Sequence, residues 1–168
     1  MQDRLPEKHN IEPFAGPDPG LLILGSFPSP MSRSSGFYYG NPRNRFWAVL
    51  ASLTGSIVPV SNDDKKEFLA EHGIALWDVV AECTVVGASD SSIRDAVYND
   101  VSAFAAENGV RAAAFNGSTA KRLFLGSGQT FPEGIKVLSL PSTSPANAAW
   151  SLERLISAWS VMSEFLRP

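Results

Sequence analysis

The chain has 168 residues, of which 44% are hydrophobic and 18% charged, and its net charge is −3. These values fit one globular domain with its own core and argue against a generally basic nucleic-acid-binding protein. One cysteine and two histidines provide neither an internal disulfide nor a metal-ligand cluster, so we expect no metal and no cofactor. Without a membrane-spanning apolar run or a signal-peptide pattern, we expect a cytoplasmic protein with no membrane contact.

In chain order, residues 1–18 are rich in proline and charge and predict an irregular arm, followed by a single domain over residues 19–168. Short apolar runs predict four strands, over residues 21–24, 74–80, 110–115 and 135–140. Apolar residues at helical spacing predict helices over residues 44–53, 63–72, 92–108 (one long or two short), 118–125 and 147–166. Strands that alternate with helices predict an α/β fold, a four-stranded parallel sheet with helices on both faces.

Polar loops follow three of the predicted strands, over residues 25–29, 116–118 and 141–145. The carboxyl ends of parallel strands share one edge of a sheet, so these loops should meet and form a cleft. Residues 19–62 contain three arginines and no acid, which favours a positive face for a polyanion. Uneven solvating charge on helices explains the same pattern equally well.

Residues 25–29, 38–47, 116–117 and 140–145 together resemble the hypoxanthine-DNA glycosylase branch of the uracil-DNA glycosylase superfamily. Residues 41–47 are also similar to a segment of mismatch-specific uracil-DNA glycosylases. The resemblance implies a three-layer sandwich around a four-stranded parallel sheet. It also implies an enzyme that hydrolyses the bond between a deaminated base, hypoxanthine first, and deoxyribose in DNA, leaving an abasic site.

The expected catalytic residue is Asn44. Many superfamily members carry Asp or Asn two residues after the first loop glycine to position water, but this chain has Phe27 there. The resemblance implies that Asn44 positions the water instead, although an amide orients water without removing its proton. Asn44 could equally cap the helix that follows, and Asn41 is the second candidate. Asp78, at a strand end, is either structural or an alternative acid–base group.

The resemblance also implies residues that bind the substrate. Expected base-binding residues are Ser26, Phe27, Tyr39 and Asn116, with Tyr39 stacking on the extruded base and Asn116 reaching its edge. Expected DNA-backbone contacts are Ser29, Arg43, Ser142, Thr143 and Ser144. Structural alternatives remain: the aromatics at 37–39 can anchor a loop in the core, Asn-Gly is a strong turn signal, and residues 141–145 can simply connect a strand to a helix.

The motif loops contain no lysine, so a Schiff-base route has no evident nucleophile, and we expect a monofunctional glycosylase that acts on DNA as a monomer. Two alternatives stay open, a uracil-DNA glycosylase and a non-catalytic module that binds damaged bases or single-stranded DNA. A general nucleotide-binding domain lacks support, because neither a Walker lysine loop nor a GxGxxG pattern occurs.

Overall fold

The central sheet is built from the four apolar runs that the sequence predicts as strands. A computed structural model describes residues 5–84 and 93–168. The sheet has the order β3-β2-β6-β7, and every neighbouring pair is parallel. Its strands are β2 (Leu21–Gly25), β3 (Ile74–Asp78), β6 (Ala112–Asn116) and β7 (Lys136–Leu140). The expected four-stranded parallel sheet is therefore confirmed.

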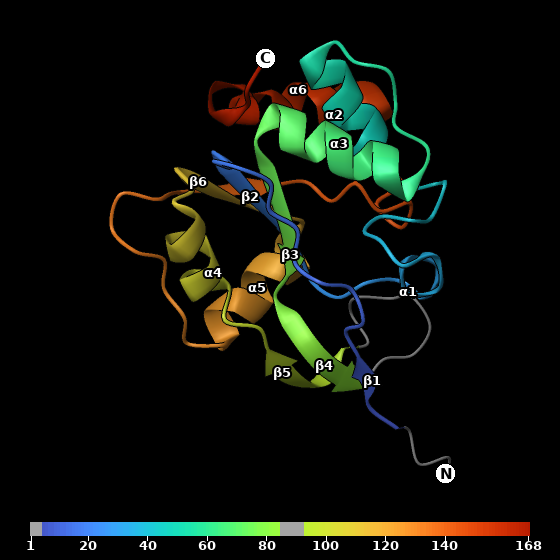
Figure 1. Ribbon diagram of the computed structural model, residues 1–168. Coiled ribbons are helices and arrows are strands. Elements are labelled where there is room, and N and C mark those ends of the chain that lie inside the picture. Colours follow the sequence, from blue (N-terminus) through green and yellow to red (C-terminus); the bar gives the residue numbers. More distant parts are fainter. Residues whose placement is uncertain (1–4, 85–92) are drawn as a thin grey trace.

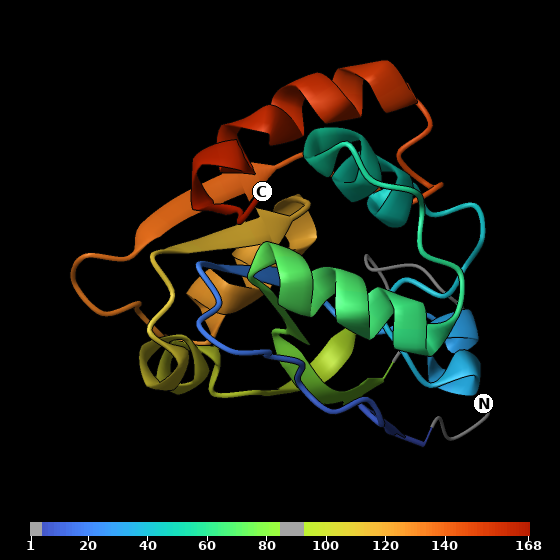
Figure 2. The same ribbon diagram turned by 45° about the horizontal axis from the view of Figure 1, so that its top comes forward.

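The two faces of this sheet bury separate cores because side chains alternate along each strand. Leu21 and Ile23 belong to one core, and Leu22 and Leu24 belong to the other. The first core is covered by α2 (Phe46–Thr54), α3 (Asn62–His72) and α6 (Leu152–Trp159), the second by α4 (Val101–Asn108) and α5 (Ser118–Gly126). Figure 1 shows these two groups of helices on opposite sides of the sheet. Figure 2 shows α6, in orange-red, beside α2, in teal.

Local signals place the ends of α3 where the sequence predicts them. The Ser61 Oγ accepts a hydrogen bond from the Asp64 N–H at 3.0 Å, and the Asp64 carboxylate accepts one from the Ser61 N–H at 3.4 Å. This capping box satisfies two of the backbone donors that a helix start leaves open. At the other end, Gly73 adopts a φ of +71°, a conformation that favours glycine.

The helix expected over residues 92–108 is wrong in its first half. Ser92 lies outside the described residues, and the chain then forms the strand β5 (Arg94–Tyr98). The helix α4 begins only at Val101. Asp100 caps this end, because its carboxylate accepts a hydrogen bond from the Ala103 N–H at 3.1 Å.

A second, antiparallel sheet explains this difference. Its order is β1-β4-β5, with β1 (Glu7–Lys8) from the N-terminal segment and β4 (Val80–Thr84) directly after β3. The single strand expected over residues 74–80 is therefore two strands in two sheets. Pairing between distant segments decides these elements, and local periodicity does not report it.

Two further elements differ from expectation. The short helix α1 (Pro30–Ser35) is absent from the sequence prediction. The last helix, expected over residues 147–166, is α6 followed by the 3₁₀ helix η2 (Ser160–Phe165). It starts late because the Ser151 Oγ accepts a hydrogen bond from the Arg154 N–H at 3.2 Å, which caps α6 at that point.

Candidate active site

An open cleft of about 1100 Å³ lies at the carboxyl ends of the parallel strands. The three polar loops of the sequence analysis line it, together with residues from the segment before α2. Parallel strands deliver the residues that follow them to one edge of the sheet, which is why segments more than a hundred positions apart share this cleft.

Nine of the ten expected site residues line the cleft. They are Ser26, Phe27, Ser29, Tyr39, Asn44, Asn116, Ser142, Thr143 and Ser144. Arg43 is the exception, since it is exposed and does not belong to the lining. Its backbone N–H donates to the Asn41 side chain at 2.9 Å, and Asn41 itself lines the cleft.

A hydrogen-bond network joins Asn44, Thr143 and Asn116, which come from three different loops. The Thr143 Oγ1 donates to the Asn44 Oδ1 at 2.8 Å, and the Asn116 Nδ2 donates to the Thr143 Oγ1 at 3.0 Å. The Thr143 N–H donates to the Asn116 Oδ1, also at 3.0 Å. Thr143 is fully buried, so the network fixes these loops relative to one another. Each end of the Asn116 amide makes one of these bonds and keeps capacity for a second.

The amide of Asn44 has two separate ends in this site. Its Oδ1 accepts from Thr143 and also from the Phe46 N–H at 3.0 Å, so it helps to start α2. Both lone pairs of this oxygen are thus engaged. Among the described residues, no acceptor bonds the Nδ2. An amide N–H can hold a water molecule by its oxygen, so capping the helix and contacting water are compatible.

The three consecutive aromatics serve both core and cleft. Phe37 and Tyr38 are buried and anchor the loop, and Tyr38 and Tyr39 both line the cleft. The Tyr39 ring stacks on Phe46 with centroids 3.9 Å apart, and the Trp47 Nε1 donates to the Tyr39 carbonyl at 3.2 Å. Tyr39 has a φ of +54°, a strained conformation for a tyrosine that the surrounding contacts hold in place.

Arg45 braces the loop after β7, a role that the sequence does not reveal. Its guanidinium donates to the carbonyls of four residues of this loop: Thr143 at 3.4 Å, Ser144 at 2.8 Å, Asn147 at 3.1 Å and Trp150. The Arg45 backbone N–H also donates to the Thr143 carbonyl, at 3.1 Å. These partners are about a hundred positions away, so no local pattern could have identified them.

The start of α5 beyond Ser118 is a second part of the site that sequence reasoning missed. Ser118, Thr119 and Lys121 line the cleft, and no side chain of the described part of the chain caps this helix. The first N–H groups of a helix carry a partial positive charge and favour anions. With the exposed Lys121 ammonium beside them, they make this wall of the cleft suited to phosphate.

Asp78 places a carboxylate in the same cleft. It is buried at the end of β3, directly opposite Gly25 in the register of the sheet. The His9 Nε2 lies 2.9 Å from the Asp78 Oδ2, so a residue of the N-terminal segment contacts the site. Nearby, burial chiefly, and Asp78 in second place, raise the pKa of Tyr38, whose hydroxyl stays protonated and donates to the Glu12 carbonyl at 2.8 Å.

Within residues 5–84 and 93–168, no group of three or more His, Cys, Asp or Glu side chains could hold a metal ion. In the same part of the chain, no helix is long and apolar enough to cross a membrane. Among the described residues, the charged groups that line the cleft are Lys121 and Asp78. The described lining thus offers amides, hydroxyls, aromatic rings and these two charged side chains.

Comparison with known proteins gives consistent similarities. A family model described as the uracil DNA glycosylase superfamily matches residues 12–163. A Methanosarcina acetivorans protein named hypoxanthine DNA glycosylase is 34% identical over 139 residues, 80% of this chain and 84% of that protein. A Methanosarcina barkeri protein of the same name is 33% identical over 97 residues, 57% of this chain and 61% of that protein.

Similarity extends to a solved structure. A solution NMR structure of a candidate uracil DNA glycosylase from Methanosarcina acetivorans matches with a TM-score of 0.75 and 31% sequence identity. The match covers 95% of this chain and 97% of the other. The likeness therefore covers the sheet, the helices of both layers and the loops that form the cleft.

Proposed function

This chain belongs to the uracil DNA glycosylase superfamily, and on that premise we propose that it is a monofunctional DNA glycosylase that removes deaminated bases, hypoxanthine first. The observation that carries the proposal is the match of residues 12–163 to the superfamily. These residues include every described loop of the cleft. The two relatives reported above are both named hypoxanthine DNA glycosylase. Such an enzyme acts on a base that has left the DNA stack, and an open cleft of about 1100 Å³ offers room for one.

The proposed reaction is a hydrolysis at the anomeric carbon of the damaged nucleotide. The oxygen of water bonds to C1′, the N-glycosidic bond breaks, and the base leaves with the electron pair and takes up a proton. In this proposal Tyr39 stacks on the flipped base, and Asn44 holds the water through its Nδ2. Because an amide cannot accept the proton, the positive charge that develops on the sugar supplies most of the attraction for water.

Neighbouring residues complete the proposed site. Ser26 and Phe27 form the wall beside the base, and the hydroxyls of Ser29, Ser142 and Ser144 contact phosphates. Thr143 positions Asn44 from its buried place in the network. Arg43, outside the cleft, would contact DNA that flanks the lesion. Since one chain supplies the whole cleft, we propose a monomer, acting on DNA in the cytoplasm.

Excision assays on defined oligonucleotides test this function. Duplexes that carry a single hypoxanthine, uracil or xanthine are incubated with the full chain, and alkali then cleaves any abasic site. We expect cleavage at hypoxanthine, and none in the undamaged duplex. Faster cleavage at uracil would make the protein a uracil-DNA glycosylase, and tight binding without any cleavage would make it a binding module. Strand cleavage before alkali would contradict a monofunctional enzyme.

The phosphate role of the α5 wall leads to a separate prediction. Lys121→Ala should weaken binding of a hypoxanthine duplex several-fold and reduce the slope of log K against log salt by about 0.9, the value for one lost phosphate contact. Arg122→Ala is the matched control, because Arg122 follows in the same helix and is exposed but does not line the cleft. Fluorescence anisotropy over a salt series measures both slopes, and equal slopes would remove Lys121 from the DNA interface.

A further inference from the structure

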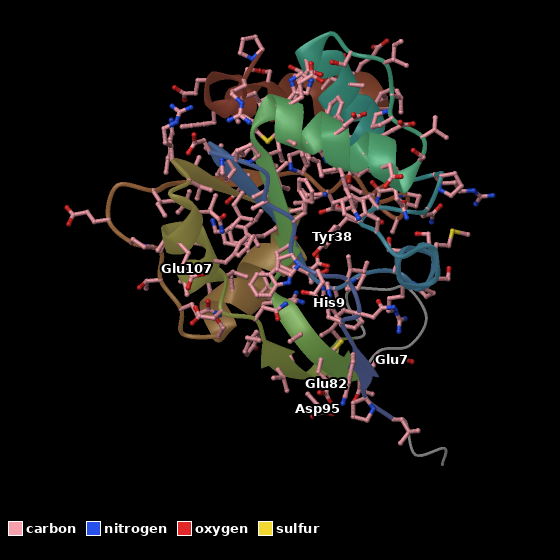
Figure 3. All side chains as sticks on the ribbon, in the orientation of Figure 1. Glu7, His9, Tyr38, Glu82, Asp95 and Glu107 are labelled. Carbon is pink, nitrogen blue, oxygen red and sulfur yellow. The ribbon has the colours of Figure 1, made fainter. Side chains whose placement is uncertain are left out.

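His9 and Asp78 form a buried pair whose hydrogen-bonding directions the structure determines. Their side chains are each 4% exposed, and the His9 Nε2 lies 2.9 Å from the Asp78 Oδ2. The Ile11 N–H donates to the His9 Nδ1 at 3.2 Å, so that nitrogen is the acceptor. The Nε2 therefore carries the hydrogen and donates it to Asp78. Figure 3 shows His9 and Tyr38 near one another, at the level where β3 gives way to β4.

Other contacts hold this pair rigidly. The His9 ring meets the edge of Phe27 with centroids 6.0 Å apart and Tyr38 at 6.1 Å. The Asn99 Nδ2 donates to the Asp78 carbonyl at 2.9 Å, which ties the backbone of Asp78 to the segment before α4. Asp78 is thus held through its backbone carbonyl by Asn99 and through its Oδ2 by His9.

The other carboxylate oxygen, Oδ1, has no such partner. Asp78 is among the lining residues, and no donor of the described residues bonds its Oδ1. Gly25 allows the approach, since a Cβ at that position would lie 2.5 Å from the Asp78 Oδ1 and 3.1 Å from the Tyr39 hydroxyl. A carboxylate oxygen accepts hydrogen bonds only, so a ligand N–H in the cleft is a suitable partner for it.

We propose that Asp78 determines base specificity by accepting the ring N–H of the flipped base, and that His9 is the positioning residue that aims its carboxylate. This inference rests on the proposed function. Asn116, the residue expected to read the base edge, has both ends of its amide bonded to Thr143. Asp78 offers a charged acceptor at the same sheet edge, with an Oδ1 that no donor of the described residues bonds, close to the Tyr39 ring on which the base would stack.

The chemistry of deamination explains why an acceptor is the suitable group. In adenine N1 is a hydrogen-bond acceptor, but in hypoxanthine N1 carries a hydrogen. The same change occurs at N3 when cytosine becomes uracil. An ionised carboxylate only accepts hydrogen bonds, so Asp78 attracts the N–H of a deaminated base and repels the lone pair of its parent at that position. Asp78 then separates each deaminated base from its own parent by a single hydrogen, whereas guanine and thymine carry the same ring N–H and are not distinguished by this contact.

A binding cycle tests this role without relying on activity. Duplexes carry either hypoxanthine or unsubstituted purine, which lacks the N1 hydrogen, on a 2′-fluoroarabinose that resists cleavage. The wild-type chain should bind hypoxanthine about tenfold or more tightly than purine, the effect of one hydrogen bond to a charged acceptor. Asp78→Asn should abolish most of this preference. Because each preparation binds both duplexes, the ratio does not depend on the folded fraction.

Variants of His9 separate positioning from simple structural support. His9→Gln retains an N–H that can reach Asp78 and should keep most of the preference, whereas His9→Phe should lose it. Asp63→Asn, an exposed site on α3, is the control and should leave the ratio unchanged. The inference is overturned if Asp78→Asn binds the two duplexes with the same ratio as the wild-type chain. If Asp78→Asn does not fold, an unchanged ratio in His9→Phe overturns it instead. If the wild-type chain excises hypoxanthine but these variants keep its preference for hypoxanthine over purine, the proposed function stands and only the role of Asp78 fails.

Discussion

Replacing Asn44 with alanine should lower the rate of hypoxanthine excision by about 10³-fold, within the range for loss of a group that orients a reacting water. The substitution removes the Nδ2 that would hold the water. It also removes the Oδ1 that accepts from Thr143 and Phe46, so the cleft loops lose one connection. Single-turnover excision at saturating enzyme measures the chemical step, and anisotropy measures DNA binding, which should change much less than the rate.

Two further variants make the Asn44 result specific. Asn44→Asp keeps the oxygen that accepts from Thr143 and Phe46 and replaces only the Nδ2, so it should stay folded and retain more activity than Asn44→Ala. Asn41→Ala is the matched control, since Asn41 lines the same cleft and its side-chain bond to the Arg43 N–H is local. If Asn41→Ala loses the activity and Asn44→Ala keeps it, the water-positioning role belongs to Asn41.

Arg45→Ala should be the most destabilising single change near the cleft. The guanidinium holds the carbonyls of Thr143, Ser144, Asn147 and Trp150, and all four lose a charged donor together. We expect the free energy of unfolding to fall by about 3 kcal/mol, because hydrogen bonds to charged groups contribute about 1.5 to 3 kcal/mol each and are not additive. Excision should fall as well, because the loop that carries the Thr143 hydroxyl loses its brace.

Urea denaturation and excision assays on the same preparations test this expectation. Arg43→Ala is the control two positions away, exposed and outside the cleft, and should change stability by less than about 0.5 kcal/mol. Arg45→Lys should recover little, because one ammonium cannot reach carbonyls spread from Thr143 to Trp150 as a planar guanidinium does. Equal stability of Arg45→Ala and the wild-type chain would show that water replaces the guanidinium without cost.

The parts of the fold that sequence reasoning predicted are those with local causes. The strands of the parallel sheet are short apolar runs, and α3 has a capping box at one end and Gly73 at the other. The strand β5 was mistaken for helix because its pairing with β4 is a contact between separate segments. Similarly, the stretch before the Ser151 cap of α6 is not helical, because it forms turns whose Asn147 and Trp150 carbonyls accept from the distant Arg45.

The site, like the fold, has one part that the sequence predicts and another that it does not. Its convergence on one edge was predictable, because a parallel sheet brings its carboxyl ends together whatever the loops contain. The partners of Arg45, the contact of His9 with Asp78 and the place of Lys121 in the cleft wall were not predictable. Each depends on segments that are far apart in the chain and adjacent only after folding.

By itself, the sequence determined the parallel sheet with helices on both faces, the family resemblance and the set of loops in which the chemistry had to lie. Apolar periodicity, caps and short motifs act over a few residues, so they can be read along the chain. Only the tertiary structure decided what each polar group in the cleft has left to offer. It bonds both ends of Asn116 to Thr143, leaves the Nδ2 of Asn44 and the Oδ1 of Asp78 without a partner among the described residues, and assigns Arg45 to the loop. Hydrogen-bond capacity is limited, so which atoms remain for a substrate depends on every neighbour that folding brings near.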